Sequence, residues 1–285
     1  MDISNSPTFH LLNASTIVAC AGGFRIYIAF LLTGIIPKPL VILAYGLIVY
    51  STYTLDRALG CEEDAINRRE LLGANKNIGI GASIFTFLTG AVFLAADHIY
   101  LASFLPFVTG YVYSKGLSMG NYTLKLKGSM GSKNIVIGLT WGGSIALIIS
   151  RYTSNIFTIC SVFFFFGIKM FINSALYDFK DVNGDLASGL RTLPVCLGEA
   201  ATKCLLLGLC IFLYISIIFS TLSGYLRPAW VLLTVSFIFT ASFICCYSVG
   251  FEERMHGIRK KFRLWMVIGE WPAALFSQWA ANLIL

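Results

Sequence analysis

Long apolar stretches separated by polar connections run through the whole sequence. Each stretch holds roughly 17 to 25 residues, enough to cross a hydrocarbon core of ~30 Å as a helix. Lipid offers the backbone no hydrogen-bond partners, so an α-helix is the expected form of each stretch. The nine stretches cover Ala14–Ile36, Pro39–Leu55, Ile78–Ala96, Ile99–Ser114, Asn134–Ser150, Phe157–Tyr177, Cys204–Ser223, Trp230–Ser248 and Leu264–Leu285.

Composition supports a membrane protein. Hydrophobic residues make up 57% of the 285 residues and charged residues 12%, whereas a soluble domain is roughly 45 to 50% apolar. The predicted fold class is therefore all-α, a polytopic membrane bundle of about nine transmembrane helices that forms a single domain over residues 1–285. Six of the eight cysteines lie inside apolar stretches, among them Cys160, Cys204, Cys210, Cys245 and Cys246, so they are read as small core residues and not as a disulfide framework.

The basic residues orient this bundle. The first, third, fifth and seventh connections are short and contain only Lys38, Arg151 and Arg227, whereas most of the 21 Lys and Arg residues lie in the longer, even-numbered connections. Lys and Arg concentrate on the cytoplasmic side of membrane proteins. We therefore expect the N-terminus and the long loops to be cytoplasmic. The net charge of +7 then reports topology and not nucleic-acid binding, and the polar N-terminus predicts no cleaved signal peptide.

Three carboxylates follow the sixth apolar stretch with D-x2-D-x3-D spacing: Asp178, Asp181 and Asp185. Mg²⁺ prefers oxygen ligands and usually takes one or two carboxylates together with substrate phosphates. If the helix continued, successive members would share a face, but Asn183-Gly184 is a turn signal that favours a loop for Asp185. The alternative interpretation is a solvated helix end with scattered charges.

Residues 178–198, with Gly189, Thr192, Pro194 and Gly198 after the carboxylates, closely resemble the second Asp-rich motif of the UbiA-type intramembrane prenyltransferase superfamily. The resemblance extends to nine helices and to paired loops after the second and sixth. It implies a central cavity open to cytoplasmic Asp-rich loops, two or more Mg²⁺ ions and an isoprenyl diphosphate substrate.

The first motif of that family, N-x3-D-x3-D followed by a basic loop, is altered in this chain. Counting back from Asp64 places Gly60 and Asp56 at the other two positions, so the central carboxylate is missing. On a straight helix Asp56 and Asp64 would lie about 12 Å apart, too far to share one ion. Gly60 is where we expect the helix to break. The alternative is a degraded motif whose charges are structural.

A diphosphate beside these carboxylates needs cations. The connection after the fourth stretch supplies Lys125, Lys127 and Lys133, and Arg69 follows the first motif. Taken alone, each of these cations is also explained as one of the basic residues that orient the bundle in the membrane.

Ionisable groups inside the apolar stretches are costly and need partners. Lys169, Asn173 and Tyr177 form a polar stripe that points along the sixth helix toward Asp178. Lys169 and Asn173 are thus candidates for the diphosphate or for a structural role. Arg25 and Glu270 are expected to pair across the bundle.

An ionised allylic diphosphate leaves a cation that requires a dry, aromatic cavity. The candidate lining residues are Tyr50, Tyr53, Tyr113, Trp141 and Tyr177. The predicted activity is metal-assisted ionisation in which Asp56, Asp64, Asp178, Asp181 and Asp185 hold Mg²⁺. The expected partners are an isoprenyl diphosphate, an aromatic or lipophilic acceptor and membrane lipid, without nucleic acid.

Three functions remain open. A prenyltransferase would pass the cation to the acceptor. In a terpene cyclase of the same superfamily, the alkenes of the prenyl chain itself would attack the cation and form a ring. A transporter or a non-catalytic scaffold would explain the helices but not the motif, and the sequence shows no convincing internal repeat.

Overall fold

The computed structural model describes residues 6–60, 71–115, 117–119, 122–124, 130–187, 189–254 and 258–284. Within these ranges helices occupy every apolar stretch named above. The elements in chain order are α1 (Pro7–Asn13), α2 (Thr16–Thr33), α3 (Pro39–Leu59), α5 (Lys76–Ala96), α6 (Leu101–Lys115), β1 (Leu117–Met119), β2 (Tyr122–Leu124), α7 (Ser132–Ile149), α8 (Ile156–Asp178), α9 (Val182–Ala187), α10 (Leu193–Leu197), α11 (Glu199–Leu222), α12 (Trp230–Cys246), α13 (Val249–Arg254), α14 (Arg259–Leu264), the π-helical turn η3 (Trp265–Gly269) and α15 (Glu270–Ile284).

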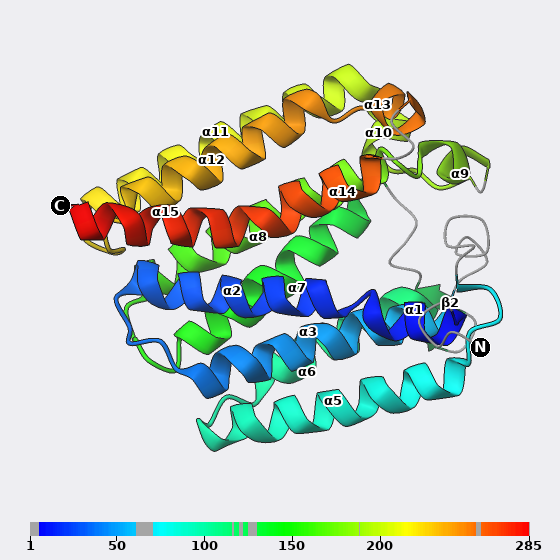
Figure 1. Ribbon diagram of the computed structural model, residues 1–285, viewed down its shortest axis with the longest axis horizontal. Coiled ribbons are helices and arrows are strands. Elements are labelled where there is room, and N and C mark those ends of the chain that lie inside the picture. The colour runs from blue at the N-terminus through cyan, green and yellow to red at the C-terminus, as the bar shows by residue number, and fades with distance from the viewer. Residues whose placement is uncertain are drawn as a thin grey trace.

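The long helices lie side by side in one bundle, and the short helices gather at one end of it (Figure 1). In this bundle α3 packs against α2, α5 and α6, α7 packs against α8, and α12 packs against α15. Helices α1, α9, α10 and α13 and the strands β1 and β2 lie at the same end. This end receives the C-termini of α3 and α8, and therefore Asp56 and Asp178.

Six helical spans among the described residues are long and apolar enough to cross a membrane, and α12 and the first part of α6 are shorter apolar helices. The ninth stretch is divided into α14, η3 and α15. The structure therefore supports a membrane-spanning helical bundle.

The all-α fold contains one small β element among the described residues. Strands β1 and β2 form a small antiparallel hairpin in which Leu117 is opposite Leu124. The hairpin lies in the connection before α7, where the hydrophobic periodicity of the sequence gives no strand signal.

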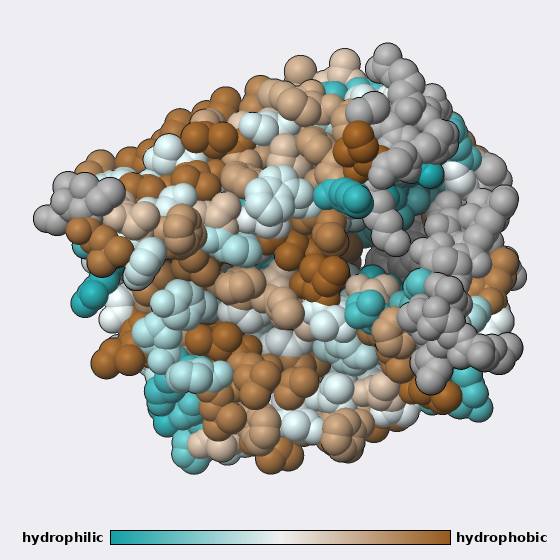
Figure 2. All heavy atoms as spheres, viewed as in Figure 1, coloured by the Kyte–Doolittle hydropathy of each residue, from teal (hydrophilic) through white to brown (hydrophobic). Residues whose placement is uncertain are grey.

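Large apolar side chains on the outer faces of the helices are exposed. Phe85, Phe219 and Leu222 are each about two-thirds or more exposed, and hydrophobic residues cover much of the surface (Figure 2). A water-soluble protein rarely leaves such extensive apolar patches uncovered. The outer faces of this bundle are suited to lipid.

Small residues bring α7 and α8 close together. A Cβ atom added to Gly142 would come within 2.7 Å of the Phe163 carbonyl oxygen, and one added to Gly138 within 2.8 Å of the Gly167 carbonyl oxygen. Small residues at such crossings let helix backbones approach in membranes, where packing and not hydrophobicity drives association. The start of α7 is thereby held beside the end of α8.

Candidate active site

Asp178 ends α8 and is completely buried. Its two carboxylate oxygens accept hydrogen bonds from α7: Lys133 Nζ donates to Oδ1 at 2.7 Å, and Asn134 Nδ2 donates to Oδ2 at 2.9 Å. Asn134 also donates to Ser174 Oγ at 2.9 Å, which fixes the amide against α8. A buried carboxylate requires such compensation. Lys133 was expected near the acidic motif, and the structure places it there.

Asp181 follows in the turn after α8 and is partly exposed. Lys180 Nζ lies 3.2 Å from Asp181 Oδ1, and 18% of the Asp181 side chain is accessible. Because the contact is open to water, it contributes little to stability and can be exchanged for a ligand.

Asp185 is a buried carboxylate on α9, one turn beyond Asp181. The Asp185 amide donates to the Asp181 carbonyl oxygen at 2.8 Å. Burial raises the pKa of Asp185 to about 6; the charge of Lys133 opposes this rise, whereas Asp181 and Asp178 add to it. Asn183 and Gly184 belong to α9 and do not break the helix as the turn signal predicted.

The three carboxylates therefore lie at one end of the bundle, where Asp178 and Asp181 add to the rise in the pKa of Asp185. Within the described part of the chain, no three His, Cys, Asp or Glu side chains lie close enough to hold one metal ion by themselves. Oxygen ligands of this kind nonetheless suit Mg²⁺, which commonly takes one or two carboxylates and completes its shell with substrate phosphates and water.

The first acidic motif begins on α3. Asp56 lies in the last turn of this helix, which ends at Leu59, and Gly60 follows with φ of +53°. The predicted helix break at Gly60 is confirmed, because an L-residue with a side chain rarely adopts this conformation. Asp64 and Arg69 lie outside the described residues, as do Lys125 and Lys127.

Aromatic rings lie between α3 and α7, deeper in the bundle than the carboxylates. The Tyr53 and Trp141 rings are stacked with centroids 5.7 Å apart, and Tyr45 contacts Trp141 edge-on at 6.2 Å. Tyr45 OH and Ser144 Oγ share a hydrogen bond of 2.7 Å. The expected residues Tyr53 and Trp141 are thus in direct contact, and Tyr50 and Tyr177 are partly buried. The side chain of Tyr113 lies outside the described set.

Lys169 has partners other than the acidic motif. Its ammonium forms an ion pair with Glu270 and donates to Thr240 Oγ1 at 2.8 Å and to Ser236 Oγ at 2.9 Å. Lys169 lies nine residues before Asp178, about 13 Å along α8. The expected pairing of Arg25 with Glu270 is wrong, because Lys169 occupies that carboxylate. Asn173 is buried, and its Nδ2 has no hydrogen-bond partner in the described residues.

Two contributors to this end of the bundle were not predicted from the sequence. Asn134 is an ordinary residue near a helix start, and no motif marks it as a partner of Asp178. Arg263 on α14 donates to Tyr247 OH at 3.2 Å. Both depend on contacts between helices that are distant in sequence, so only the folded arrangement identifies them.

Comparison with known proteins agrees with this fold. A family model described as the UbiA prenyltransferase family matches residues 11–267. No curated protein matches the chain in a sequence search.

Several solved structures share the architecture. A UbiA homologue from Aeropyrum pernix K1, solved in the apo state, has a TM-score of 0.62 at 13% identity, with 92% of this chain and 98% of that chain covered. A UbiA homologue from Archaeoglobus fulgidus, bound to DMAPP and Mg²⁺, has a TM-score of 0.59 at 16% identity over 94% and 99% of the two chains. A structure reported for digeranylgeranylglyceryl phosphate synthase also has a TM-score of 0.59 at 16% identity, over 93% and 97%.

Proposed function

Since this chain belongs to the UbiA prenyltransferase family, we propose that it ionises an isoprenyl diphosphate with the help of Mg²⁺ and transfers the prenyl group to an acceptor. The observation that carries the proposal is the junction of α7 and α8, where Lys133 and Asn134 hold Asp178 beside Asp181 and Asp185. The Archaeoglobus fulgidus homologue was solved with DMAPP or GPP and Mg²⁺, which supports the same substrate class.

In the proposed complex, Asp178, Asp181 and Asp185 would act with Asp56 and Asp64 as ligands for two or more Mg²⁺ ions. Bound Mg²⁺ would neutralise the charge that develops on the diphosphate leaving group. Lys133 moves from Asp178 to a diphosphate oxygen, which frees the carboxylate as the substrate arrives. Arg69, Lys125 and Lys127 are the remaining cations proposed to contact the diphosphate.

The chemistry is a substitution at an allylic carbon. The bond between C1 and the diphosphate oxygen breaks with its electron pair on the oxygen, and an electron-rich atom of the acceptor then bonds to C1. The acceptor finally loses a proton. Tyr53 and Trp141, with Tyr50, Tyr113 and Tyr177, exclude water and present aromatic faces to the allylic cation. Lys169 has a structural role in this proposal, because Glu270 neutralises it.

The cyclase alternative rests on the altered first motif, in which Gly60 stands at the position of the central carboxylate. Both reactions begin with ionisation, so the product separates them. Purified protein in detergent is incubated with Mg²⁺ and prenyl diphosphates of several lengths, with and without an aromatic acceptor. A prenylated acceptor is the expected product. A cyclic hydrocarbon formed without acceptor would replace the transferase proposal by the cyclase.

The catalytic role of the acidic motif is tested with Asp181→Ala, since Asp181 is accessible and its loss does not leave a buried partner. We expect diphosphate release to fall by roughly 100-fold or more. The same substitution at Asp97, on the far side of the bundle, serves as the control. Diphosphate release that is insensitive to Asp181→Ala would exclude both reactions at this site.

We further propose that nine helices span the membrane and that the acidic loops face the cytoplasm. The bias of Lys and Arg toward the even-numbered connections supports this orientation. Single-cysteine labelling with a membrane-impermeant reagent from each side tests it, on a background that lacks the eight native cysteines. A cysteine at Lys180 should react only from the cytoplasmic side, and one at Lys38 only from the opposite side.

A further inference from the structure

Gly60 stands where the first acidic motif lacks its central carboxylate, and a cation lies in the space beside it. A Cβ atom added to Gly60 would come within 3.5 Å of Nζ of Lys76, the first residue of α5. Lys76 is exposed, and the ion pairs found among the described residues do not include it. The chain thus has an ammonium at the point where the motif has lost a carboxylate.

The backbone at Gly60 keeps this space open. Its φ of +53° and ψ of +137° form a combination that residues with a Cβ rarely adopt. The Gly60 amide donates to the Asp56 carbonyl oxygen at 3.2 Å, so the turn follows directly on the last hydrogen bond of α3. The Lys76 side chain therefore approaches the end of α3 without meeting a side chain at position 60.

The short helix α1 holds both sides of the connection between α3 and α5. On the α5 side, the Asn75 amide donates to Thr8 Oγ1 at 3.0 Å. On the α3 side, Arg57 Nη1 donates at 2.7 Å to Oγ of Ser15, which follows α1 and is buried. The residues immediately before Lys76 and three before Gly60 are thus tied to the same N-terminal segment.

Leu11 of α1 fills the space where α3 and α5 meet. It is 1% exposed, and a Cβ atom added to Gly79 would lie 2.8 Å from Leu11 Cδ2 and 2.9 Å from Ala58 Cβ. Gly79 lies about one turn after Lys76, and Ala58 lies two residues before Gly60. The close contact of the two helices therefore fixes the backbone of Lys76 beside the end of α3.

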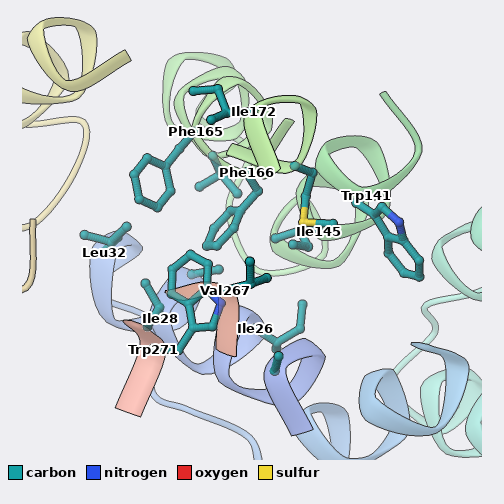
Figure 3. Packing of buried hydrophobic residues seen from close by; sticks show 14 of the residues in the cluster. Ile26, Ile28, Leu32, Trp141, Ile145, Phe165, Phe166, Ile172, Val267 and Trp271 are labelled. Atoms are coloured by element: carbon teal, nitrogen blue, oxygen red, sulfur yellow. The ribbon is translucent and has the colours of Figure 1, made fainter. Parts of the chain in front are cut away.

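The interior of the bundle is unsuited to the diphosphate itself. Phe166 and Trp271 pack between α2, α8 and α15 (Figure 3), and both are completely buried. Lys169 at this depth is paired with Glu270. The guanidinium carbon of Arg25 lies 6.0 Å from the centre of the Trp271 ring. An anion with several charges is costly in such surroundings, so we place the diphosphate at the end of the bundle, where α3 ends and α5 begins.

We propose that Lys76 binds an oxygen of the substrate diphosphate directly, on the side of the site where residue 60 offers no carboxylate to a metal ion. The assignment to the diphosphate rests on the proposed function. Mg²⁺ needs oxygen ligands from the protein, whereas an ammonium brings its positive charge and three donors without them. Asp56, one turn before Gly60, keeps its proposed role as a metal ligand. Helix α1 is then a positioning element for Lys76.

Binding of inorganic pyrophosphate tests the role of Lys76 without catalysis. The full chain is reconstituted in nanodiscs of neutral phosphatidylcholine and dialysed to equilibrium against labelled pyrophosphate with Mg²⁺. Lys76→Gln should weaken binding by about tenfold, because a hydrogen bond between charged groups contributes on that order. Lys76→Glu should weaken it further through charge repulsion, and Lys76→Arg should retain most of the native affinity.

Lys203→Gln is the matched control for the loss of a surface charge. Lys203 lies at the same end of the bundle, on the first turns of α11, and forms an ion pair with Glu199 at 3.0 Å. This variant removes the same charge as Lys76→Gln and should leave pyrophosphate binding unchanged. The thermal midpoint of each variant is recorded, so that loss of folding is separated from loss of binding.

Thr8→Val tests the positioning role of α1. It removes the acceptor of the Asn75 amide next to Lys76 but leaves the contact between Ser15 and Arg57. We expect pyrophosphate binding to weaken roughly threefold in the native background and not at all in Lys76→Gln, because the effect passes through the lysine. Equal weakening in both backgrounds would contradict the positioning role.

The failure of this inference is distinguishable from the failure of the proposed function. If Lys76→Gln and Lys76→Glu fold and bind pyrophosphate as the native protein does, the inference is overturned, and the effect of Asp181→Ala on diphosphate release still tests the proposed function. A native protein that binds no pyrophosphate in Mg²⁺ also overturns the inference. If binding depends on Lys76 but no prenyl diphosphate is ionised, the site stands and the proposed function fails.

Discussion

Lys133 at the start of α7 and Asp178 at the end of α8 form an ion pair with 2.7 Å between Nζ and Oδ1, although 45 residues separate them in the chain. Asp178 is buried, whereas 30% of the Lys133 side chain is accessible. The difference in exposure decides which of the two side chains can leave the ion pair. Lys133 can turn toward an arriving diphosphate without losing contact with water, but Asp178 cannot remain charged in the core without a replacement cation.

Removal of Lys133 should therefore be costly in the absence of substrate. Lys133→Met leaves a buried carboxylate with Asn134 as its remaining described partner, and we expect a loss of about 2 kcal/mol in the free energy of unfolding. The double variant Lys133→Met/Asp178→Asn removes both charges and should recover most of that loss. Thermal unfolding in detergent measures both. A double variant no more stable than Lys133→Met would contradict the coupling between the two groups.

The Asp185 carboxyl should make metal binding depend on pH in the mildly acidic range. Its pKa is raised to about 6, so below pH 6 the carboxyl is mainly protonated and Mg²⁺ must displace the proton. We expect the apparent affinity for Mg²⁺ to fall by about tenfold per pH unit below that value. Mg²⁺ titrations of diphosphate release between pH 5 and 8 measure this slope. The conservative variant Asp185→Asn should remove it.

The same pKa shift predicts the direction of the stability change without metal. The folded pKa of about 6 lies above the unfolded value of ~3.9, so the native state binds the proton more tightly. The stabilisation is complete below about pH 4 and is lost as the pH rises through 6. Thermal midpoints of native protein and Asp185→Asn, compared in EDTA, should converge toward the acidic end of this window. Midpoints that differ equally at pH 4.5 and pH 7 would exclude this assignment.

Lys169 and Glu270 should behave as a structural pair. Because both side chains are 1% exposed, Glu270→Gln leaves a buried ammonium and should destabilise the protein by ~3 to 5 kcal/mol. Lys169→Met/Glu270→Gln removes both charges and should be considerably more stable than the single variant. If Lys169 is structural, the double variant keeps Mg²⁺-dependent diphosphate release. A folded double variant without this release would instead place Lys169 at the diphosphate.

The sequence was sufficient to predict the membrane bundle and the acidic segments, because both depend on local signals. Apolar length alone predicts a spanning helix, and the run from Asp178 to Gly198 is a contiguous motif. Gly60 likewise reveals a helix end through its own conformational freedom. These features need no knowledge of which helices are neighbours.

Features that depend on the choice of neighbouring helix were predicted less well. The stripe of Lys169, Asn173 and Tyr177 was identified on α8, but the periodicity of one helix does not reveal that Glu270 faces Lys169 or that Arg25 faces Trp271. The role of Asn134 was missed for the same reason. The β1–β2 hairpin was missed because three-residue strands are too short for a periodic signal.

The close contact between α7 and α8 should control the geometry of the acidic site from a distance. Gly142→Ala places a Cβ 2.7 Å from the Phe163 carbonyl oxygen and 2.8 Å from Gly167 Cα, both of them backbone atoms that can move only if the helices separate. We expect a loss of about 1 to 3 kcal/mol in stability from this overpacking, together with weaker Mg²⁺-dependent diphosphate release, because Lys133 and Asp178 lie on the two separated helices. Gly81→Ala is the matched control, since an added Cβ on that α5 residue meets nothing within 4 Å. If Gly142→Ala and Gly81→Ala have equal stability and equal diphosphate release, the close helix contact does not position the site.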